Sequence, residues 1–260
     1  MTYDSMPGIR WSALKHMRES PMMYHYQLTA PRVDTPAFAL GRAVHTLVFE
    51  PALFESEYAI WDGGTRRGKE WADFQEFHEG KTILCEKDVD TCYEMADAVG
   101  MHPLVDQYLS GGIFERVIEW TDSATGLPCK AKPDWIIPDR KILLDLKTTR
   151  SINARRFGAE AARFGYHCQM AHYRNGIKAA QGWYAERVLL VAVEKEAPHD
   201  VAVFELGFED MQAGEDEVAE LLRAVRFCTD KGQWPGMYEQ EQMLQLPAYI
   251  HGEVEFEYAE

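Results

Sequence analysis

Two aspartates and a lysine accompany two apolar runs in KPDWIIPDRKILLDLKTT, residues 132–149. Asp134 lies beside WII, and Asp145 and Lys147 follow ILL, with PDR between the two runs. Branched and aromatic residues on both sides of a proline turn predict a β-hairpin. Side chains two apart in a strand share a face, so Asp145 and Lys147 are expected to point the same way. A carboxylate beside buried strands is costly unless something compensates its charge.

A divalent cation is one such compensation, because Mg²⁺ prefers carboxylate and carbonyl oxygens. Asp134 and Asp145, on adjacent strands, would hold the ion between them, and the carbonyl of Leu146 would supply a third oxygen. Lys147 would then lie beside the water that the ion activates, where it could position or help deprotonate that water and offset phosphate charge. The alternative is an Asp–Lys ion pair at a strand end. The preceding Pro-Asp and the basic residues that follow favour the metal site.

Composition predicts an ordinary soluble globular protein. The 260 residues are 46% hydrophobic and 27% charged, which fits one domain over 1–260: a helical part (1–110), a catalytic core (111–206) and a C-terminal helix and tail (207–260). The sequence shows no secretory signal and no apolar run of the ~20 residues that a membrane helix needs. The five cysteines are odd in number and scattered, which favours a reducing, cytoplasmic location. Their spacing argues against a structural zinc or iron–sulfur site.

Charge is unevenly distributed along the chain. The formal net charge is −15, which alone disfavours nucleic acid as a partner. Residues 130–187, however, hold 12 Lys/Arg against 5 Asp/Glu, a local +7, and this basic segment contains the Asp-Asp-Lys set. Either it binds a polyanion or its charges cluster by chance on a solvated helix face. The acidic remainder would keep the protein in solution.

The expected elements describe a mixed α/β fold, with a central mixed sheet flanked by helices. Ser12 is a candidate N-cap of the first helix and Pro21 an interruption within it. Helices are expected over 9–27, 36–50, 70–79, 88–101, 152–164, 166–181 and 209–229, and strands over 113–121, 127–137, 141–148, 187–194 and 200–206.

Several motifs together carry a family resemblance. Pro-Asp at 133–134 with Asp-Leu-Lys at 145–147 resembles the PD-(D/E)xK nuclease motif. Gln169 and Tyr173 resemble the QxxxY helix motif of the RecB and lambda-exonuclease branch, and His45 resembles the helix histidine of RecB-type nucleases. From about residue 10 to 250 the chain is most similar to nuclease domains of the exonuclease VIII (RecE) type.

This resemblance implies a restriction-endonuclease-like core and a phage-type recombination exonuclease. Such an enzyme uses Mg²⁺, with Mn²⁺ as a substitute, to digest one strand of linear duplex DNA from its 5′ end, and it leaves a 3′ single strand for an annealing protein. The resemblance also implies a ring-shaped trimer or tetramer. Asp145 departs from lambda exonuclease, which has Glu there. The alternatives are an endonuclease or junction resolvase on the same core, or a catalytically silent DNA mimic or scaffold.

Further residues are candidates for the catalytic site. Gln169 and Tyr173 are four apart on one helix face, where the Gln could bond to the water or a carboxylate and the Tyr could contact a phosphate or base. Glu115, on the strand before the hairpin, is a candidate ligand of the metal or water. His45 is a candidate metal ligand; without the resemblance, a packed core histidine would be the better interpretation.

Other residues are candidates for DNA contact or assembly. The Gly-rich loop 62–70 is expected to act as a DNA-contacting lid, with solvated surface as the alternative. Thr149 could donate to phosphate or cap the next helix, and the aromatic tail and the acidic helix 209–229 could form a subunit interface. The DNA candidates are Arg66, Arg67, Lys69, Thr149, Arg150, Arg155, Arg156, Arg42 and Ser12; the tail candidates are Trp234, Tyr238, Tyr249 and Phe256.

Overall fold

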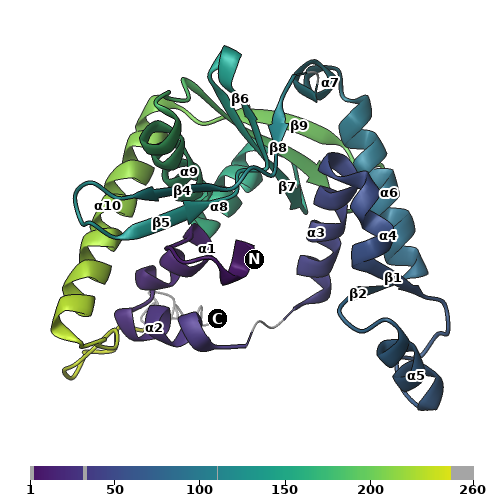
Figure 1. Ribbon diagram of the computed structural model, residues 1–260, viewed down its shortest axis with the longest axis horizontal. Helices are drawn as coiled ribbons and strands as arrows, with labels where there is room; N and C mark the ends of the chain where they lie inside the picture. Colours follow the sequence, from purple (N-terminus) through teal and green to yellow (C-terminus); the bar gives the residue numbers. More distant parts are fainter. Residues whose placement is uncertain (1–2, 32–33, 110, 247–260) are drawn as a thin grey trace, which may run out of the picture.

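A five-stranded mixed sheet forms the centre of the protein (Figure 1). The structure, a computed structural model, describes residues 3–31, 34–109 and 111–246. The strand order is β3-β6-β7-β8-β9; β7 and β8 pair in parallel, and the other pairs are antiparallel. The strands are β3 (Ile113–Phe114), β6 (Trp135–Ile137), β7 (Ile142–Thr149), β8 (Arg187–Glu194) and β9 (Val201–Glu205). The expected mixed α/β fold is therefore confirmed.

Alternation along the central strands divides the interior into two cores. On β7, Leu143 belongs to one core, whereas Leu144 and Leu146 belong to the other. On β8, Leu190 and Val191 divide in the same way. Successive side chains of a strand point to opposite faces, so the near-continuous apolar runs are buried on both sides.

Different helices cover the two faces. The first core includes residues of α1 (Trp11–Leu14), α8 (Ala154–Phe164), α9 (Tyr166–Gln181) and α10 (Phe208–Lys231). The second core includes residues of α3 (Pro36–Phe49), α6 (Glu86–Met101) and α7 (Pro103–Leu109). In Figure 1, α9 and α10 lie on one side of the sheet, and α3 and α6 lie on the other.

The turn between α8 and α9 depends on glycine. Gly165 has φ +69, a left-handed conformation in which a side chain is strained. A Cβ there would lie 2.7 Å from both Trp11 Cζ2 and Arg18 Nη1. The start of α8 is capped by Asn153, whose Oδ1 accepts from the Arg156 N–H at 3.3 Å. The expectation that Thr149 could cap this helix is therefore wrong.

The N-terminal helix is interrupted, as Pro21 predicted, but it is more broken than expected. It consists of α1, a 3₁₀ segment over Lys15–Arg18, and α2 (Pro21–Thr29). Ser20 caps α2 by accepting from the Met23 N–H at 3.0 Å, and Pro21 occupies the first turn, where its missing N–H costs nothing. Ser12 is not an N-cap, because it lies inside α1, which Arg10 precedes.

Two expected strands are each divided. The stretch 113–121 forms β3 and β4 (Ile118–Thr121), and 127–137 forms β5 (Pro128–Ala131) and β6. The β4–β5 pair is a separate antiparallel ribbon. The breaks fall at Glu115–Val117 and Lys132–Asp134, so Glu115 and Asp134 lie just outside regular strands.

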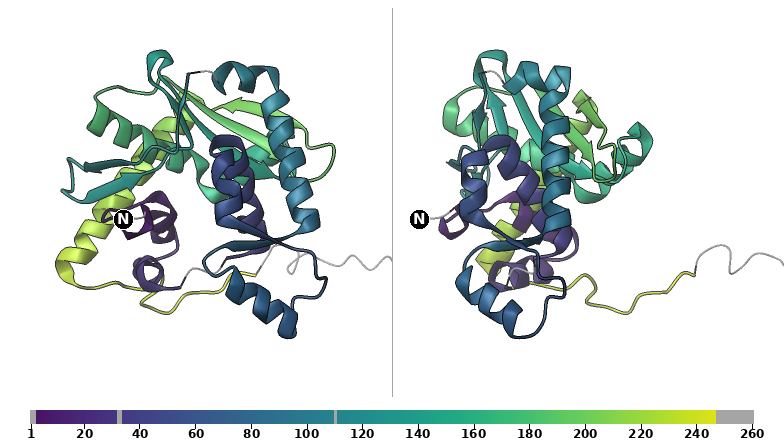
Figure 2. Two further views of the ribbon diagram at one scale, coloured as in Figure 1. Left: turned by 45° about the vertical axis from the view of Figure 1, so that its right-hand side comes forward. Right: turned by 90° about the vertical axis from the view of Figure 1, so that its right-hand side faces the viewer.

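A small arm was not expected from the sequence. Parallel strands β1 (Tyr58–Trp61) and β2 (Thr82–Cys85) carry α5 (Lys69–Phe77), which extends away from the sheet (Figures 1 and 2). The helix at 69–77 was expected, but the two strands and α7 were not. The remaining short helical segments are Tyr3–Ser5, Pro51–Leu53, α4 (Phe54–Glu57) and Pro138–Arg140.

The C-terminal tail is only partly described. Trp234 packs beside Tyr24 and stacks on His25, with ring centroids 5.6 and 4.8 Å apart. Tyr238 is 66% exposed, whereas Tyr249 and Phe256 lie outside the described residues. Within the described ranges, no helix has both the length and the apolar character needed to cross a membrane.

The close packing of α9 and α10 yields a stability prediction. A Cβ at Gly214 would lie 2.6 Å from the backbone oxygen of His167, so Gly214→Ala must push two helices apart. We expect this substitution to destabilise the fold by about 1–3 kcal/mol in urea unfolding. Gly158→Ala on α8 is the matched control, since a Cβ there meets nothing within 4 Å. It should add about 0.5–1 kcal/mol through helix propensity. Equal stability of the two variants would contradict the close approach.

Candidate active site

Three acidic residues stand side by side at one end of the sheet. Extending the β6–β7 register beyond Trp135 and Leu144 places Asp134 opposite Asp145. Extending the β3–β6 register places Glu115 opposite Asp134, and the Glu115 N–H donates to the Asp134 carbonyl at 3.0 Å. The hairpin thus brings together the two aspartates predicted from the sequence and adds Glu115 beside them.

The Asp134 side chain accepts a backbone N–H of β7 where strand pairing with β6 has ended. Its Oδ2 accepts the backbone N–H of Leu146 at 2.8 Å, at the point where β6 has ended and β7 continues. The same oxygen lies 3.3 Å from Nδ1 of His45 on α3. Burial would raise the pKa of Asp134, but the charges of His45 and Lys147 and the bond from Leu146 hold that pKa below its usual value. Burial would lower the pKa of His45, but Asp134 raises it overall. The two side chains thus each stabilise the charged form of the other.

Asp145 is the most deeply buried acid of the row, at 1% exposed. Its Oδ2 forms an ion pair with the ammonium of Lys147, two residues along the same face. Its Oδ1 accepts from Nε2 of Gln169 at 3.2 Å. Burial and the negative charge of Asp134 raise the pKa of Asp145 to about 6. Two neighbouring carboxylates with this little solvent favour the approach of additional positive charge.

Helix α9 orients the lysine. Gln169 Oε1 accepts from Lys147 Nζ at 2.9 Å, and Gln169 Nε2 also donates to the Tyr173 hydroxyl at 2.8 Å. The Lys147 ammonium lies 4.5 Å from the ring centroid of Tyr166. Gln169 and Tyr173, predicted to share a helix face, therefore lie on the side of α9 that faces the sheet. Gln169 joins Asp145, Lys147 and Tyr173 into one network.

Glu115 lies in the site, although not on a strand as expected. It follows β3 with φ +50, a strained conformation for a side-chain-bearing residue. Its carboxylate forms an ion pair with Lys132. Burial and the charge of Asp134 raise the pKa of Glu115 to about 7, although Lys132 acts in the opposite sense. Strain of this kind is often found at functional sites.

The residues fit a divalent cation. One ligand atom each from His45, Glu115 and Asp134 lie within 4.8 Å of one another. The buried Oδ2 of Asp145 accepts no well-aligned hydrogen bond despite its ion pair with Lys147. Two or three carboxylates and an imidazole are a donor set for Mg²⁺ or Mn²⁺. The ligand role of the Leu146 carbonyl stays a prediction.

The basic residues after β7 are mostly solvent-facing. Arg150, Arg155 and Arg156 are exposed around the start of α8, where they are available to a polyanion. Contrary to the expectation, Thr149 is not available to contact DNA: it is 1% exposed, and its hydroxyl donates to Glu160 at 3.1 Å. Ser12 is exposed on α1.

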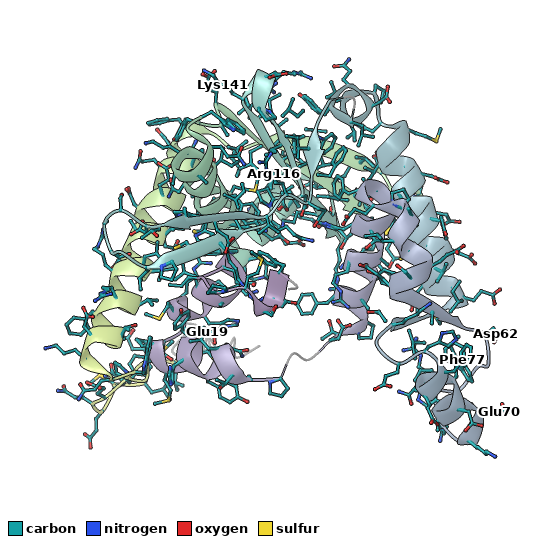
Figure 3. All side chains as sticks on the ribbon, viewed as in Figure 1. Glu19, Asp62, Glu70, Phe77, Arg116 and Lys141 are labelled. Carbon is teal, nitrogen blue, oxygen red and sulfur yellow. The ribbon has the colours of Figure 1, made fainter. Side chains whose placement is uncertain are left out.

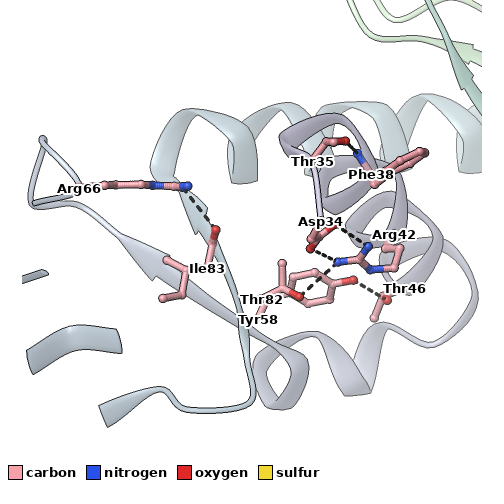
Figure 4. A network of polar contacts seen from close by, with 9 residues as sticks. All are labelled: Asp34, Thr35, Phe38, Arg42, Thr46, Tyr58, Arg66, Thr82 and Ile83. Atoms are coloured by element: carbon pink, nitrogen blue, oxygen red, sulfur yellow. Dashed lines mark hydrogen bonds and ion pairs between the residues drawn. The ribbon is translucent and has the colours of Figure 1, made fainter. Parts of the chain in front are cut away.

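The basic residues of the arm region are exposed but already make contacts. Arg66 donates to the Ile83 carbonyl at 3.3 Å (Figure 4). Arg66 also lies over the Trp71 ring, and Arg67 and Lys69 are exposed. Arg42 is paired through both of its terminal nitrogens with Asp34, at 2.9 and 2.5 Å (Figure 4). Their proposed contacts with DNA stay predictions.

Sequence reasoning did not identify four residues around the network. Lys132 pairs with Glu115, and Tyr166 lies beneath Lys147. Glu160 accepts from Thr149 and from Tyr166, at 3.1 and 3.4 Å, and so ties the α8–α9 pair to the end of β7. Lys15 is close enough to Lys147 to feel its charge. Only Lys132 had a signal in the sequence, as the residue immediately before Pro-Asp.

Comparison with known families identifies the domain. A family model described as "PDDEXK-like domain of unknown function (DUF3799)" matches residues 11–247. The chain belongs to this family. It therefore carries a nuclease-type PD-(D/E)xK domain, as the motif predicted, and nucleases of this type use divalent metal ions. No curated protein matches the sequence.

One solved structure shares the fold. A protein from Eubacterium rectale described as a "Putative exonuclease" superposes with a TM-score of 0.64 at 14% identity, over 95% of each chain. A "phage related exonuclease" from Haemophilus somnus 129PT superposes much less closely, with a TM-score of 0.36 at 12% identity, over 87% of this chain and 96% of the other. At 14% identity the first match shows a shared fold.

The acidic row yields a metal-binding prediction. Mg²⁺ should raise the unfolding temperature of the wild-type chain, because a ligand held only by the folded state stabilises it by about 2.7 kcal/mol at 100 times its Kd. Asp134→Asn and Asp145→Asn should lose this shift, and Lys147→Gln should retain it. Asp139→Asn, at the exposed hairpin turn, is the control and should behave as wild type. A full Mg²⁺ shift in both site aspartate variants would contradict the assignment.

Proposed function

We propose that the protein is a Mg²⁺-dependent 5′→3′ exodeoxyribonuclease that digests one strand of linear duplex DNA. The observation that supports it best is the network of Asp145, Lys147, Gln169 and Tyr173, beside which Asp134 accepts the backbone N–H of Leu146. A DNA mimic or scaffold would need acidic surface but no lysine held between a buried carboxylate and a glutamine. The polarity and the recombination role rest on the resemblance to exonuclease VIII.

The side chains of the network divide the chemistry among them. Asp134, Asp145, His45 and Glu115 would hold the divalent cation, which when bound activates a water and neutralises phosphate charge. Lys147, fixed by Gln169 and Tyr166, would orient that water and donate to a phosphate oxygen as negative charge develops there. Tyr173, whose pKa burial raises well above the usual value, stays protonated and can donate a hydrogen bond.

The surface charges support a DNA path beside this network. Arg150, Arg155 and Arg156 are exposed on the segment that directly follows β7, the strand that carries Asp145 and Lys147. Arg66, Arg67 and Lys69 on the arm would contact DNA farther from the site. Such contacts supply affinity through release of counterions rather than sequence recognition.

Labelled linear duplexes test the activity. With Mg²⁺ the wild-type chain should release the 5′ label first, and EDTA should abolish release. Asp145→Asn should lower the rate by about a thousandfold or more, because several kcal/mol of charge stabilisation are removed, whereas Asp139→Asn should match wild type. Cleavage of covalently closed circles would identify an endonuclease or resolvase instead. No cleavage by the wild-type chain with either Mg²⁺ or Mn²⁺ would overturn the proposal.

We also propose that several copies close into a ring, a trimer or tetramer, that passes a single strand to an annealing protein. An acidic chain with one basic segment holds DNA weakly alone, and a ring would surround the duplex with several such segments. Exposed apolar side chains on α10 and the tail are candidate contacts: Phe208, Phe227, Met243 and Leu244, between 64% and 90% exposed. Closed rings need two different patches on each subunit.

Light scattering at micromolar concentration tests the ring. The expected mass is three or four times the 29.8 kDa of one chain. Phe227→Ser should lower that mass if α10 forms the contact. Phe77→Ser is the control, because Phe77 lies on the arm and is even more exposed, at 84% against 64%. A monomeric mass together with processive digestion would rule out the ring as the source of processivity.

A further inference from the structure

Lys15 is a half-buried lysine. It begins the 3₁₀ segment after α1, between the buried residues Leu14 and Met17. Within the part of the chain that the structure describes, its ammonium makes no ion pair and no hydrogen bond. Glu19, the acid whose charge reaches it, pairs with His16 at 3.3 Å. A lysine that gives up part of its hydration normally gains a carboxylate in return.

The charged group that most affects Lys15 is another lysine. Burial lowers the pKa of Lys15, the positive charge of Lys147 lowers it further, and Glu19 offsets this only in part. Lys147 is committed to Asp145 and Gln169 and does not neutralise its neighbour. The repulsion between the Lys15 and Lys147 ammonium groups is unfavourable, and a bound anion would relieve it.

Side-chain packing independently places the segment that carries Lys15 beside the start of α9. Trp11 and Arg18 both press on Gly165, where a Cβ would lie 2.7 Å from each of them. Lys15 and Arg18 are three apart in the 3₁₀ segment, where side chains three apart share a face, so we infer that Lys15 faces the first turn of α9 as Arg18 does. Tyr166 and Gln169, in that same first turn, hold Lys147. Both lysines are therefore supported by one turn of α9.

We propose that Lys15 is a second substrate-binding lysine of the active site, which together with Lys147 binds a phosphate group of the DNA strand being cut. The assignment rests on the proposed nuclease function and adds a residue to it. Lys15 would pair with the substrate and not with a metal ligand. The phosphate is either a backbone diester or the monoester at a 5′ end.

DNA binding without cleavage tests this role. Anisotropy of a fluorescent duplex is measured in Ca²⁺ across a salt series for wild type, Lys15→Gln, Lys15→Arg and Lys141→Gln. Lys15→Gln should weaken binding about tenfold and reduce the log K against log salt slope by about 0.9, the share of one phosphate. Lys15→Arg should keep the slope.

Lys141→Gln is the matched control. Lys141 is an exposed lysine paired with Glu186, and Figure 3 shows it at the opposite end of the molecule from Glu19, which follows Lys15 by four residues. It should leave both the affinity and the slope unchanged. The Mg²⁺ shift in unfolding temperature should persist in Lys15→Gln, which separates loss of phosphate binding from loss of the fold or the metal.

Two duplexes identify the phosphate. Equal weakening with 5′-phosphorylated and 5′-hydroxyl ends indicates a backbone diester, and weakening only with the phosphorylated end indicates the terminal monoester. If Lys15→Gln binds DNA with the same affinity and salt slope as the wild-type chain, the assignment of Lys15 is wrong. Cleavage by the wild-type chain would still support the nuclease function in that case. Conversely, a wild-type chain that binds DNA through Lys15 but cleaves none would overturn the proposed function alone.

Discussion

The cost of placing carboxylates at the end of a buried sheet governs the whole catalytic region. Asp145 is 1% exposed and sits opposite Asp134, so each charge is unfavourable for the other. The protein compensates from every side: a backbone N–H from Leu146, an imidazole from His45, and ammonium groups from Lys147 and Lys132. Removing one partner from such a set leaves an uncompensated buried charge. Electrostatics alone therefore limits which residues these positions can hold.

The central hairpin and the long helices were predictable because their signals are local. The apolar runs around Pro138 form β6 and β7 as expected, and Gln169 and Tyr173 share a helix face because they are four apart. The breaks in the strands were not predictable. Asp134 and Glu115 read as strand residues, but the chain leaves the ladder there because both carboxylates are used in the site.

Residues that join the site through tertiary packing left little trace in the sequence. Glu160 is one of many helix acids, and only the fold shows that it connects Thr149 to Tyr166. Gly165 allows the N-terminal segment that carries Lys15 to approach α9, through contacts with Trp11 and Arg18, which are about 150 positions away in the chain. The arm was missed because β1 and β2 are only four residues each and α5 separates them.

The site is assembled from both faces of the sheet. His45 belongs to α3, which packs on one core, whereas Gln169 and Tyr173 belong to α9, which packs on the other. Asp134 contacts His45 on α3, and Asp145 accepts from Gln169 on α9. The β6–β7 hairpin therefore connects the residues from the two faces of the sheet. The ligand group of His45, Glu115 and Asp134 precedes the PDR turn in the chain, whereas Asp145, Lys147, Gln169 and Tyr173 follow it. A chain split within the PDR turn would remain silent until its two fragments reassociated, and cleavage would then report directly on that reassembly.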